Sequence, residues 1–76
     1  MQVTELAVGL TDGKGELVRL YDWLAQRKIT VCEINLKRQE GNSVKIVLYI
    51  AMPRHFDKAD FLRLEVDIPG VQSVEI

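Results

Sequence analysis

The chain has 76 residues, of which 47% are hydrophobic and 28% are charged; this is the composition of one folded domain and excludes a disordered segment. Ten basic residues against eleven acidic residues give a net charge of -1, so no overall field attracts the phosphate backbone of a nucleic acid. We therefore expect residues 1–76 to form a single domain with no nucleic-acid partner.

The first part of the sequence predicts a strand followed by a helix. Residues 2–10 alternate as a strand does when one of its faces is covered, and the apolar side holds Leu6, Val8 and Leu10. A helical period follows, with apolar residues at i, i+3, i+4 and i+7: Leu17, Leu20, Tyr21 and Leu24. Thr11 or Asp12 is suited to cap the start of this helix, and we expect it to end near residues 27–28.

The middle of the sequence predicts two strands. Apolar positions change parity within residues 29–38, and a β-bulge near Cys32 and Glu33 would reconcile the two halves. Residues 44–52 form the most apolar segment, so we expect a central strand there. Its even positions alternate toward the helices, whereas its opposite face carries an apolar strip of Val47, Tyr49 and Ala51.

The last part of the sequence predicts a second helix and a short strand. Asp57 is placed to cap the helix, and Phe56 can pack on Phe61 as a hydrophobic staple. Two apolar stripes compete for the buried face of this helix: Phe61, Leu64 and Ile68 on one side, and Ala59, Leu62 and Val66 on the other. Residues 71–76 then alternate as a strand, with Val74 and Ile76 as expected core positions.

These elements predict an α+β, ferredoxin-like βαββαβ fold. The two most apolar strands, which begin at residues 2 and 44, should be central. The two strands with more polar residues, which begin at residues 29 and 71, should be edges, and this gives an antiparallel sheet in the order 4-1-3-2. Two helices cover one face and leave the other open. The strip of Val47, Tyr49 and Ala51 on that open face is a candidate interface. Trp23 is a second candidate, because it lies at the edge of the apolar stripe of the first helix. It is expected either at the rim of the core or in an interface as an aromatic contact residue.

No arrangement of residues predicts catalysis, a metal site or a cofactor. His55 is the single histidine and has no second ligand at metal-site spacing. A catalytic Cys32 and His55 pair is disfavoured, because a solitary cysteine in the middle of a strand is usually a small buried hydrophobe. The lone cysteine excludes an internal disulfide and fits a reducing compartment, so we expect a cytoplasmic location. The longest uncharged run, residues 46–53, is too short to insert into a membrane.

The turn at residues 12–15 is a weak candidate for ligand binding. Asp12, Gly13 and Gly15 precede a helix, whose free backbone N–H groups can receive an anion. The alternative is purely structural, because a tight connection between strand and helix needs glycine. With no second polar group evident for an ammonium, we expect protein contacts rather than an amino-acid ligand.

The pattern resembles the ACT domain family. The resemblance lies in residues 12–17 (DGKGEL), in Leu20 and Leu24, in residues 29–31 (ITV), and in residues 68–74 (IPGVQSV) with their Gly-Val-x-x-Val ending. It implies a regulatory module that dimerises through sheets or helices, and in many members binds an amino acid at the first loop, where Gly15 falls. Glu65 departs from the family pattern, which more often has an apolar residue there.

Within that superfamily, residues 44–53 (VKIVLYIAMP) followed by residues 56–58 (FDK) look most like the soluble C-terminal domain of MgtC/SapB-type membrane proteins. The resemblance implies a domain excised from a longer bacterial protein and exposed on the cytoplasmic face of the membrane. Such proteins are implicated in magnesium-limited growth and virulence. The partner would be a second copy or another domain of the parent protein. The alternative is the amino-acid-binding ACT module of a biosynthetic enzyme or stringent-response synthetase.

Overall fold

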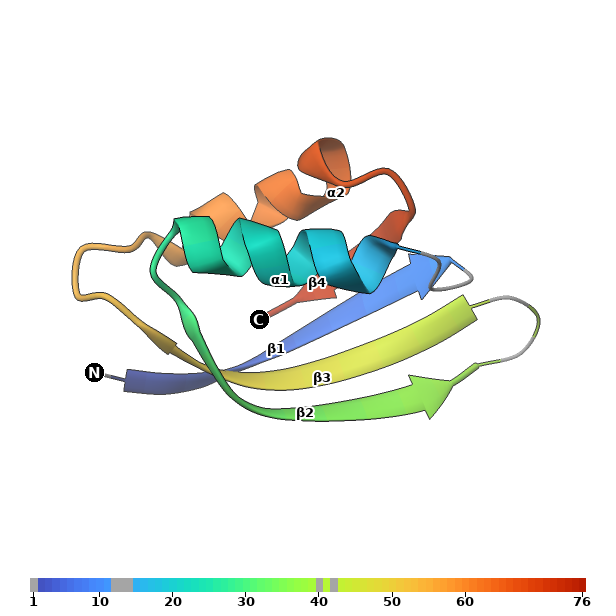
Figure 1. Ribbon diagram of the computed structural model, residues 1–76, viewed down its shortest axis with the longest axis horizontal. Helices are drawn as coiled ribbons and strands as arrows, with labels where there is room; N and C mark the ends of the chain where they lie inside the picture. The colour runs from blue at the N-terminus through green and yellow to red at the C-terminus, as the bar shows by residue number, and fades with distance from the viewer. Residues whose placement is uncertain (1, 12–14, 40, 42) are drawn as a thin grey trace.

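The computed structural model describes residues 2–11, 15–39, 41 and 43–76. The strands are β1 (Gln2–Thr11), β2 (Thr30–Arg38), β3 (Ser43–Met52) and β4 (Val71–Glu75). The helical elements are α1 (Glu16–Gln26), the 3-10 helix η1 (Lys58–Arg63) and the short α2 (Leu64–Asp67). All three helical elements lie on the same side of the sheet, so its other face is open (Figure 1).

The four strands form one antiparallel sheet in the order β2-β3-β1-β4, which is the predicted 4-1-3-2 order counted from the other edge. The ferredoxin-like fold is therefore confirmed. The two central strands pair along their whole length, from Thr11 opposite Ser43 to Val3 opposite Ala51 and beyond. Their continuous pairing gives the sheet a rigid centre, on which the positions of the surface residues depend.

The sheet contains two register shifts. In β2 the shift falls between Val31 and Glu33, which confirms the bulge predicted at this point. The shift between β1 and β4 was not predicted: Gly9 pairs with Ser73, but Leu10 pairs with Val71. The extra residue turns Val71 back toward the helices.

That second shift changes which residues of β4 enter the core. Val71 is buried, Val74 packs against the core from a half-buried position, and Ile76 is 53% exposed. The prediction that Ile76 lies in the core was therefore wrong, because β4 ends at Glu75 and Ile76 lies beyond the paired part of the sheet.

The core lies between the sheet and the helices. The central strands supply most of it, with every second residue fully or almost fully buried: Leu6, Val8, Leu10, Ile46, Leu48 and Ile50. The first helix adds Leu20, Trp23 and Leu24, whereas Tyr21 is 37% exposed. Its buried stripe is thus rotated away from Tyr21, because the second helical segment packs beside Trp23.

The second helical segment begins as predicted and winds differently. The Asp57 side chain accepts a hydrogen bond from the backbone N–H of Ala59 at 3.0 Å, and the rings of Phe56 and Phe61 lie 5.0 Å apart, which confirms both the cap and the staple. The first two turns are 3-10 helix, in which side chains three residues apart align. This winding places Phe61 and Leu64 together in the core.

The stripe that includes Phe61 and Leu64 also includes Ile68, and it is the buried one. The competing stripe faces solvent, since Leu62 is exposed and Val66 is 83% exposed. The first helix and the sheet together bury only one side of this short segment. Its other side therefore contributes little to the folding free energy.

Candidate functional site

The candidate loop before α1 is described only in part. Asp12 and Gly13 lie outside the described residues. Gly15 is the N-cap of α1 and adopts a φ of 86°, a left-handed conformation that favours glycine. The predicted capping role of Thr11 was wrong, because its hydroxyl donates instead to the carbonyl oxygen of Gly70 at 3.3 Å. Thr11 therefore joins the end of β1 to the turn that precedes β4.

The contact between α1 and the start of β4 is close. Gly70 has a φ of 102°, and a Cβ atom added there would lie 2.8 Å from Cγ of Glu16 and 3.1 Å from Oγ1 of Thr11. Oε2 of Glu16 is buried and, among the described residues, accepts no hydrogen bond. A carboxylate oxygen in this position is a potential acceptor for an ammonium group.

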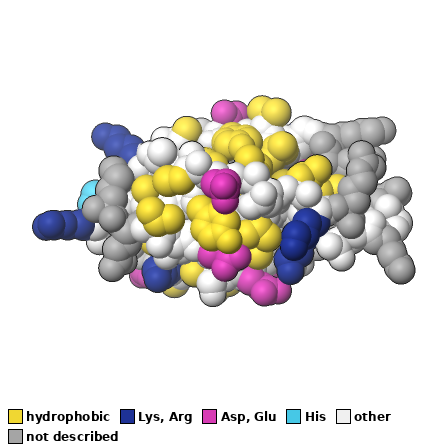
Figure 2. All heavy atoms as spheres, turned by 90° about the horizontal axis from the view of Figure 1, so that it is seen from below, with side chains coloured by type: hydrophobic (Ala, Val, Ile, Leu, Met, Phe, Trp, Pro, Cys, Tyr) yellow, Lys and Arg dark blue, Asp and Glu magenta, His cyan; other side chains and the backbone are white. Residues whose placement is uncertain are grey.

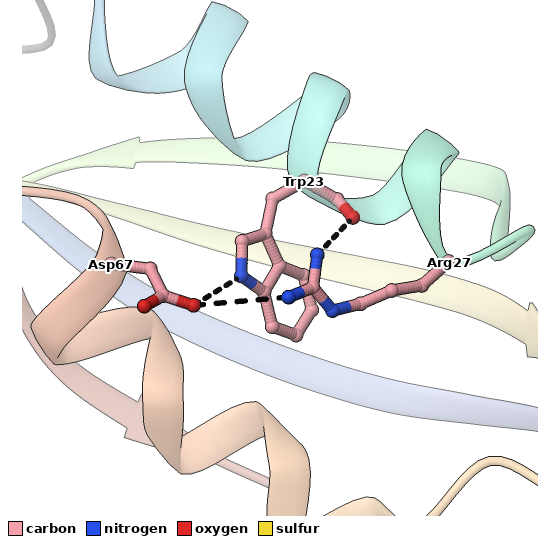
Figure 3. A network of polar contacts seen from close by, with 3 residues as sticks. All are labelled: Trp23, Arg27 and Asp67. Atoms are coloured by element: carbon pink, nitrogen blue, oxygen red, sulfur yellow. Dashed lines mark hydrogen bonds and ion pairs between the residues drawn. The ribbon is translucent and has the colours of Figure 1, made fainter.

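Trp23 lies inside the domain and joins the two helical segments (Figure 3). Only 6% of its surface is exposed, and its ring centroid lies 5.9 Å from that of Phe61. Its Nε1–H donates to Oδ2 of Asp67 in α2 at 2.9 Å. Trp23 offers too little exposed surface for an interface, so the structure favours the alternative in which this residue belongs to the core.

Arg27 completes the link around the indole ring. Its guanidinium carbon lies 3.7 Å from the ring centroid of Trp23, as in a cation–π contact. One guanidinium nitrogen donates to the backbone oxygen of Trp23 at 3.1 Å, and another lies 3.8 Å from Oδ2 of Asp67. Arg27 therefore lies over the indole ring while Asp67 binds the N–H at the ring's edge, and these two contacts hold α2 against α1.

The open face of the sheet is the candidate functional surface. Its central apolar residues are the half-buried Ala7 on β1 and Val47 and Tyr49 on β3, and Val3 beside them is 62% exposed. Ala51, which was predicted to belong to this strip, is almost fully buried and offers little surface. Figure 2 shows this face, with hydrophobic side chains gathered in its middle and acidic side chains among them.

Charged residues on this face follow the strand register. Tyr49 is paired with Glu33 on one side and with Glu5 on the other. Four residues away along β3, Lys45 is paired with Lys37. The alternation of β2 alone does not predict this arrangement, because the bulge in β2 determines the face on which Glu33 and Lys37 lie.

The residues considered for chemistry lie in exposed positions. Cys32 is exposed, so the expectation of a small buried hydrophobe was wrong: the residue falls at the bulge, where the strand alternation is interrupted. His55 is exposed in the connection after β3. Within residues 2–11, 15–39, 41 and 43–76, no three histidine, cysteine or acidic residues are grouped so as to hold a metal ion. In the same part of the chain, no helix has the length and apolar character that a membrane crossing requires.

No protein-family model and no curated protein matches this sequence. Among solved structures, the chain is similar to a formyltetrahydrofolate deformylase from Pseudomonas putida KT2440, with 15% identity and a TM-score of 0.74. The match covers 99% of this chain but 29% of the deformylase, so the chain corresponds to less than a third of that enzyme.

Two further solved structures are separate small domains. The C-terminal domain of the MgtC protein from Mycobacterium tuberculosis matches with 20% identity and a TM-score of 0.73, over 99% of this chain and 84% of that domain. The ACT domain from GTP pyrophosphokinase of Chlorobium tepidum matches with 16% identity and a TM-score of 0.66, over 96% and 94% of the two chains. The chain therefore has an ACT-like fold and resembles the C-terminal domain of MgtC.

Proposed function

We propose that this chain is a non-catalytic regulatory and interaction domain that acts through contacts made by the open face of its sheet. We further propose that it is the cytosolic C-terminal domain of an MgtC/SapB-type membrane protein, with a role in adaptation to magnesium limitation and in virulence. This assignment to an MgtC/SapB-type parent protein is supported by the structural similarity to the MgtC domain, which extends over nearly the whole of this chain.

The observation that carries the proposal is the apolar strip on the open face. The core lies on the helix side of the sheet, yet Val3, Ala7, Val47 and Tyr49 place apolar surface on the other side. A sheet face that is only solvated usually carries polar residues at these positions. Because burial of apolar surface is favourable, covering this strip with a second protein surface would stabilise the complex.

Replacing Tyr49 by lysine is expected to prevent self-association. Wild-type protein should shift from monomer toward dimer between micromolar and millimolar concentration, as measured by sedimentation velocity or light scattering. A lysine in the middle of the strip should leave the protein monomeric, because it replaces the apolar surface of the ring by an ammonium group that would have to lose its hydration in the complex. The matched control is Tyr21→Lys, which makes the same change at a partly exposed position on the helix side.

Circular dichroism should show that both tyrosine variants are folded. Wild-type protein that stays monomeric at millimolar concentration would contradict self-association. Equal loss of the dimer in Tyr21→Lys and Tyr49→Lys would assign the contact to another surface.

The second candidate is an amino-acid-binding allosteric module. One observation favours it: Oε2 of Glu16 is buried without a hydrogen-bond partner among the described residues, at the start of α1. It could accept the ammonium group of an amino acid whose carboxylate takes the backbone N–H groups of the helix. Against it, a Cβ atom placed on Gly15 would meet no atom of residues 2–11, 15–39, 41 and 43–76 within 4 Å. This point of the loop is open, whereas small-ligand sites bury most of their ligand.

We expect no amino acid to bind the isolated domain with a dissociation constant below about 1 mM, which corresponds to a binding free energy of about -4 kcal/mol. Calorimetry and chemical-shift titration with the twenty amino acids would measure it, with Glu16→Gln as the control variant. Micromolar binding with shifts centred on Gly15 and Glu16, lost in Glu16→Gln, would favour the amino-acid-binding module instead.

A further inference from the structure

We infer that the open face pairs with the same face of a second copy of this chain, with the strands of the two sheets antiparallel. In this arrangement, the two-fold axis lies across the strands over Val47. The inference rests on the proposed function and specifies its partner and geometry. It is drawn from the strand register, which arranges the charges of this face in rows.

Three rows of paired residues cross the open face. The acidic row is Glu33, Tyr49 and Glu5; the middle row is Asn35, Val47 and Ala7, and it continues to Glu75 at the β4 edge; the basic row is Lys37, Lys45 and Gly9, and it continues to Ser73. Each outer row is two residues from the middle row along every strand, which is about 7 Å. Across β2, β3 and β1, the face is therefore acidic on one side of its middle row and basic on the other, while the acidic Glu75 lies at the β4 end of the middle row.

Each outer row holds like charges close together within one copy. Lys37 and Lys45 are directly opposite each other on neighbouring strands, an arrangement that destabilises a sheet. Glu33 and Glu5 flank Tyr49 from two strands, about 10 Å apart by strand spacing, which is within the Debye length at physiological salt. Both rows therefore favour a partner that brings opposite charge.

A second copy satisfies both rows at once. Rotation by 180° about an axis along the middle row places the basic row of one copy over the acidic row of the other, and the reverse contact follows by symmetry. Lys37 then faces Glu33 of the partner subunit, and Lys45 faces the ring of Tyr49 of the partner subunit. An acidic partner would meet Glu5 and Glu33, and a basic partner would meet the two lysines.

The same charges exclude the other symmetric stacking. A two-fold axis along the strands would place lysines over lysines and glutamates over glutamates, which costs free energy. Stacked sheets lie about 10 Å apart, a distance that a lysine and a glutamate can span from opposite sides. The small residue Ala7 on β1 leaves room for the two faces to approach, whereas the side chain of Ser73 covers Gly9. The pattern thus specifies one arrangement and one strand direction.

Charge-reversal variants test this arrangement. Lys37→Glu and Glu33→Lys should each weaken self-association by about tenfold or more, because each places like charges across the two-fold axis. An equimolar mixture of the two variants should form a heterodimer of nearly wild-type affinity, since every contact between the two rows then joins opposite charges. The double variant Lys37→Glu/Glu33→Lys should recover the homodimer. Sedimentation equilibrium measures all four dissociation constants.

Two further measurements separate the interface from general charge effects. Arg63→Glu and Glu65→Lys change the net charge equally on the exposed helix side, and should leave the dissociation constant unchanged. At concentrations at which the protein is monomeric, Lys37→Glu should melt at a higher temperature than wild type, because it replaces a pair of lysines by an ion pair with Lys45. A variant that stabilises the monomer while it weakens the dimer cannot act through unfolding.

The outcomes distinguish this inference from the proposed function. If Tyr49→Lys abolishes association but the charge variants and their mixture do not differ from wild type, the open face is the interface and the antiparallel stacking is overturned. Impaired single variants whose mixture does not recover affinity would also overturn it. A wild-type protein that is monomeric at millimolar concentration would overturn this inference and the self-association on which it rests.

Discussion

Replacing Trp23 by alanine is expected to lower the free energy of unfolding by about 3 to 5 kcal/mol, the usual cost of removing a buried aromatic side chain. The indole ring packs on Phe61 and separates α1 from α2, so its loss leaves a cavity between the two helical segments. The hydrogen bond to Asp67 is lost as well, and Arg27 loses the ring on which it lies.

Urea denaturation followed by circular dichroism measures the effect of Trp23→Ala. Trp23→Phe is the matched control: it keeps an aromatic ring in the core but loses the N–H donor and part of the indole volume, so it should destabilise the protein less than Trp23→Ala. A small domain has a total stability of about 5 to 15 kcal/mol, and the alanine variant should therefore be near the limit of folding. An unchanged midpoint in Trp23→Ala would show that this ring does not hold the helices together.

Leu48→Ala is expected to lower the free energy of unfolding by about 2 to 5 kcal/mol. Leu48 is fully buried in the most central position of the sheet, paired with Leu6 on β1 and with Ile34 on β2. Neighbouring strands hold the backbone in place, so the core cannot collapse to fill the space and a cavity remains.

Leu62→Ala is the control for Leu48→Ala, since it makes the same chemical change at an exposed position of η1. It should change the free energy of unfolding by about 0.5 kcal/mol or less. Thermal and urea denaturation of the two variants measure the difference directly. Equal effects of the two substitutions would contradict the placement of the core between sheet and helices.

The sequence was sufficient for the fold, because most elements carry a local signal. Strand alternation identified the buried faces of β1 and β3, and the parity change in β2 identified its bulge. The segment after β3 carries an N-cap and a staple, so the start of the second helical segment was also predictable.

The differences arise where tertiary packing decides between two local alternatives. Tyr21 and Trp23 flank the same stripe of α1, and only the position of α2 determines that Trp23 is covered. In β4, the unpredicted shift opposite Gly9 and Leu10 brought Val71 into the core, and the end of the strand at Glu75 left Ile76 exposed. Neither result is encoded in the periodicity of a single segment.

The candidate surface was predicted only in its apolar part. Val47 and Tyr49 follow from the alternation of β3 alone. The charged rows require the pairing of three strands and the exact position of the bulge in β2, since a shift of one residue would move Glu33 and Lys37 to the helix side. Long-range register of this kind cannot be obtained from one sequence.

The largest buried side chains all lie on the helix side, so the sheet acts as a partition between the residues that determine folding and those that determine binding. Substitutions on the open face alter neither the packing around Leu48 nor the contacts of Trp23. A domain of this design can therefore acquire new partners during evolution without losing its fold. The same separation makes the domain a scaffold for engineering sets of dimers that do not cross-associate, by substitution of the charged residues of the open face alone.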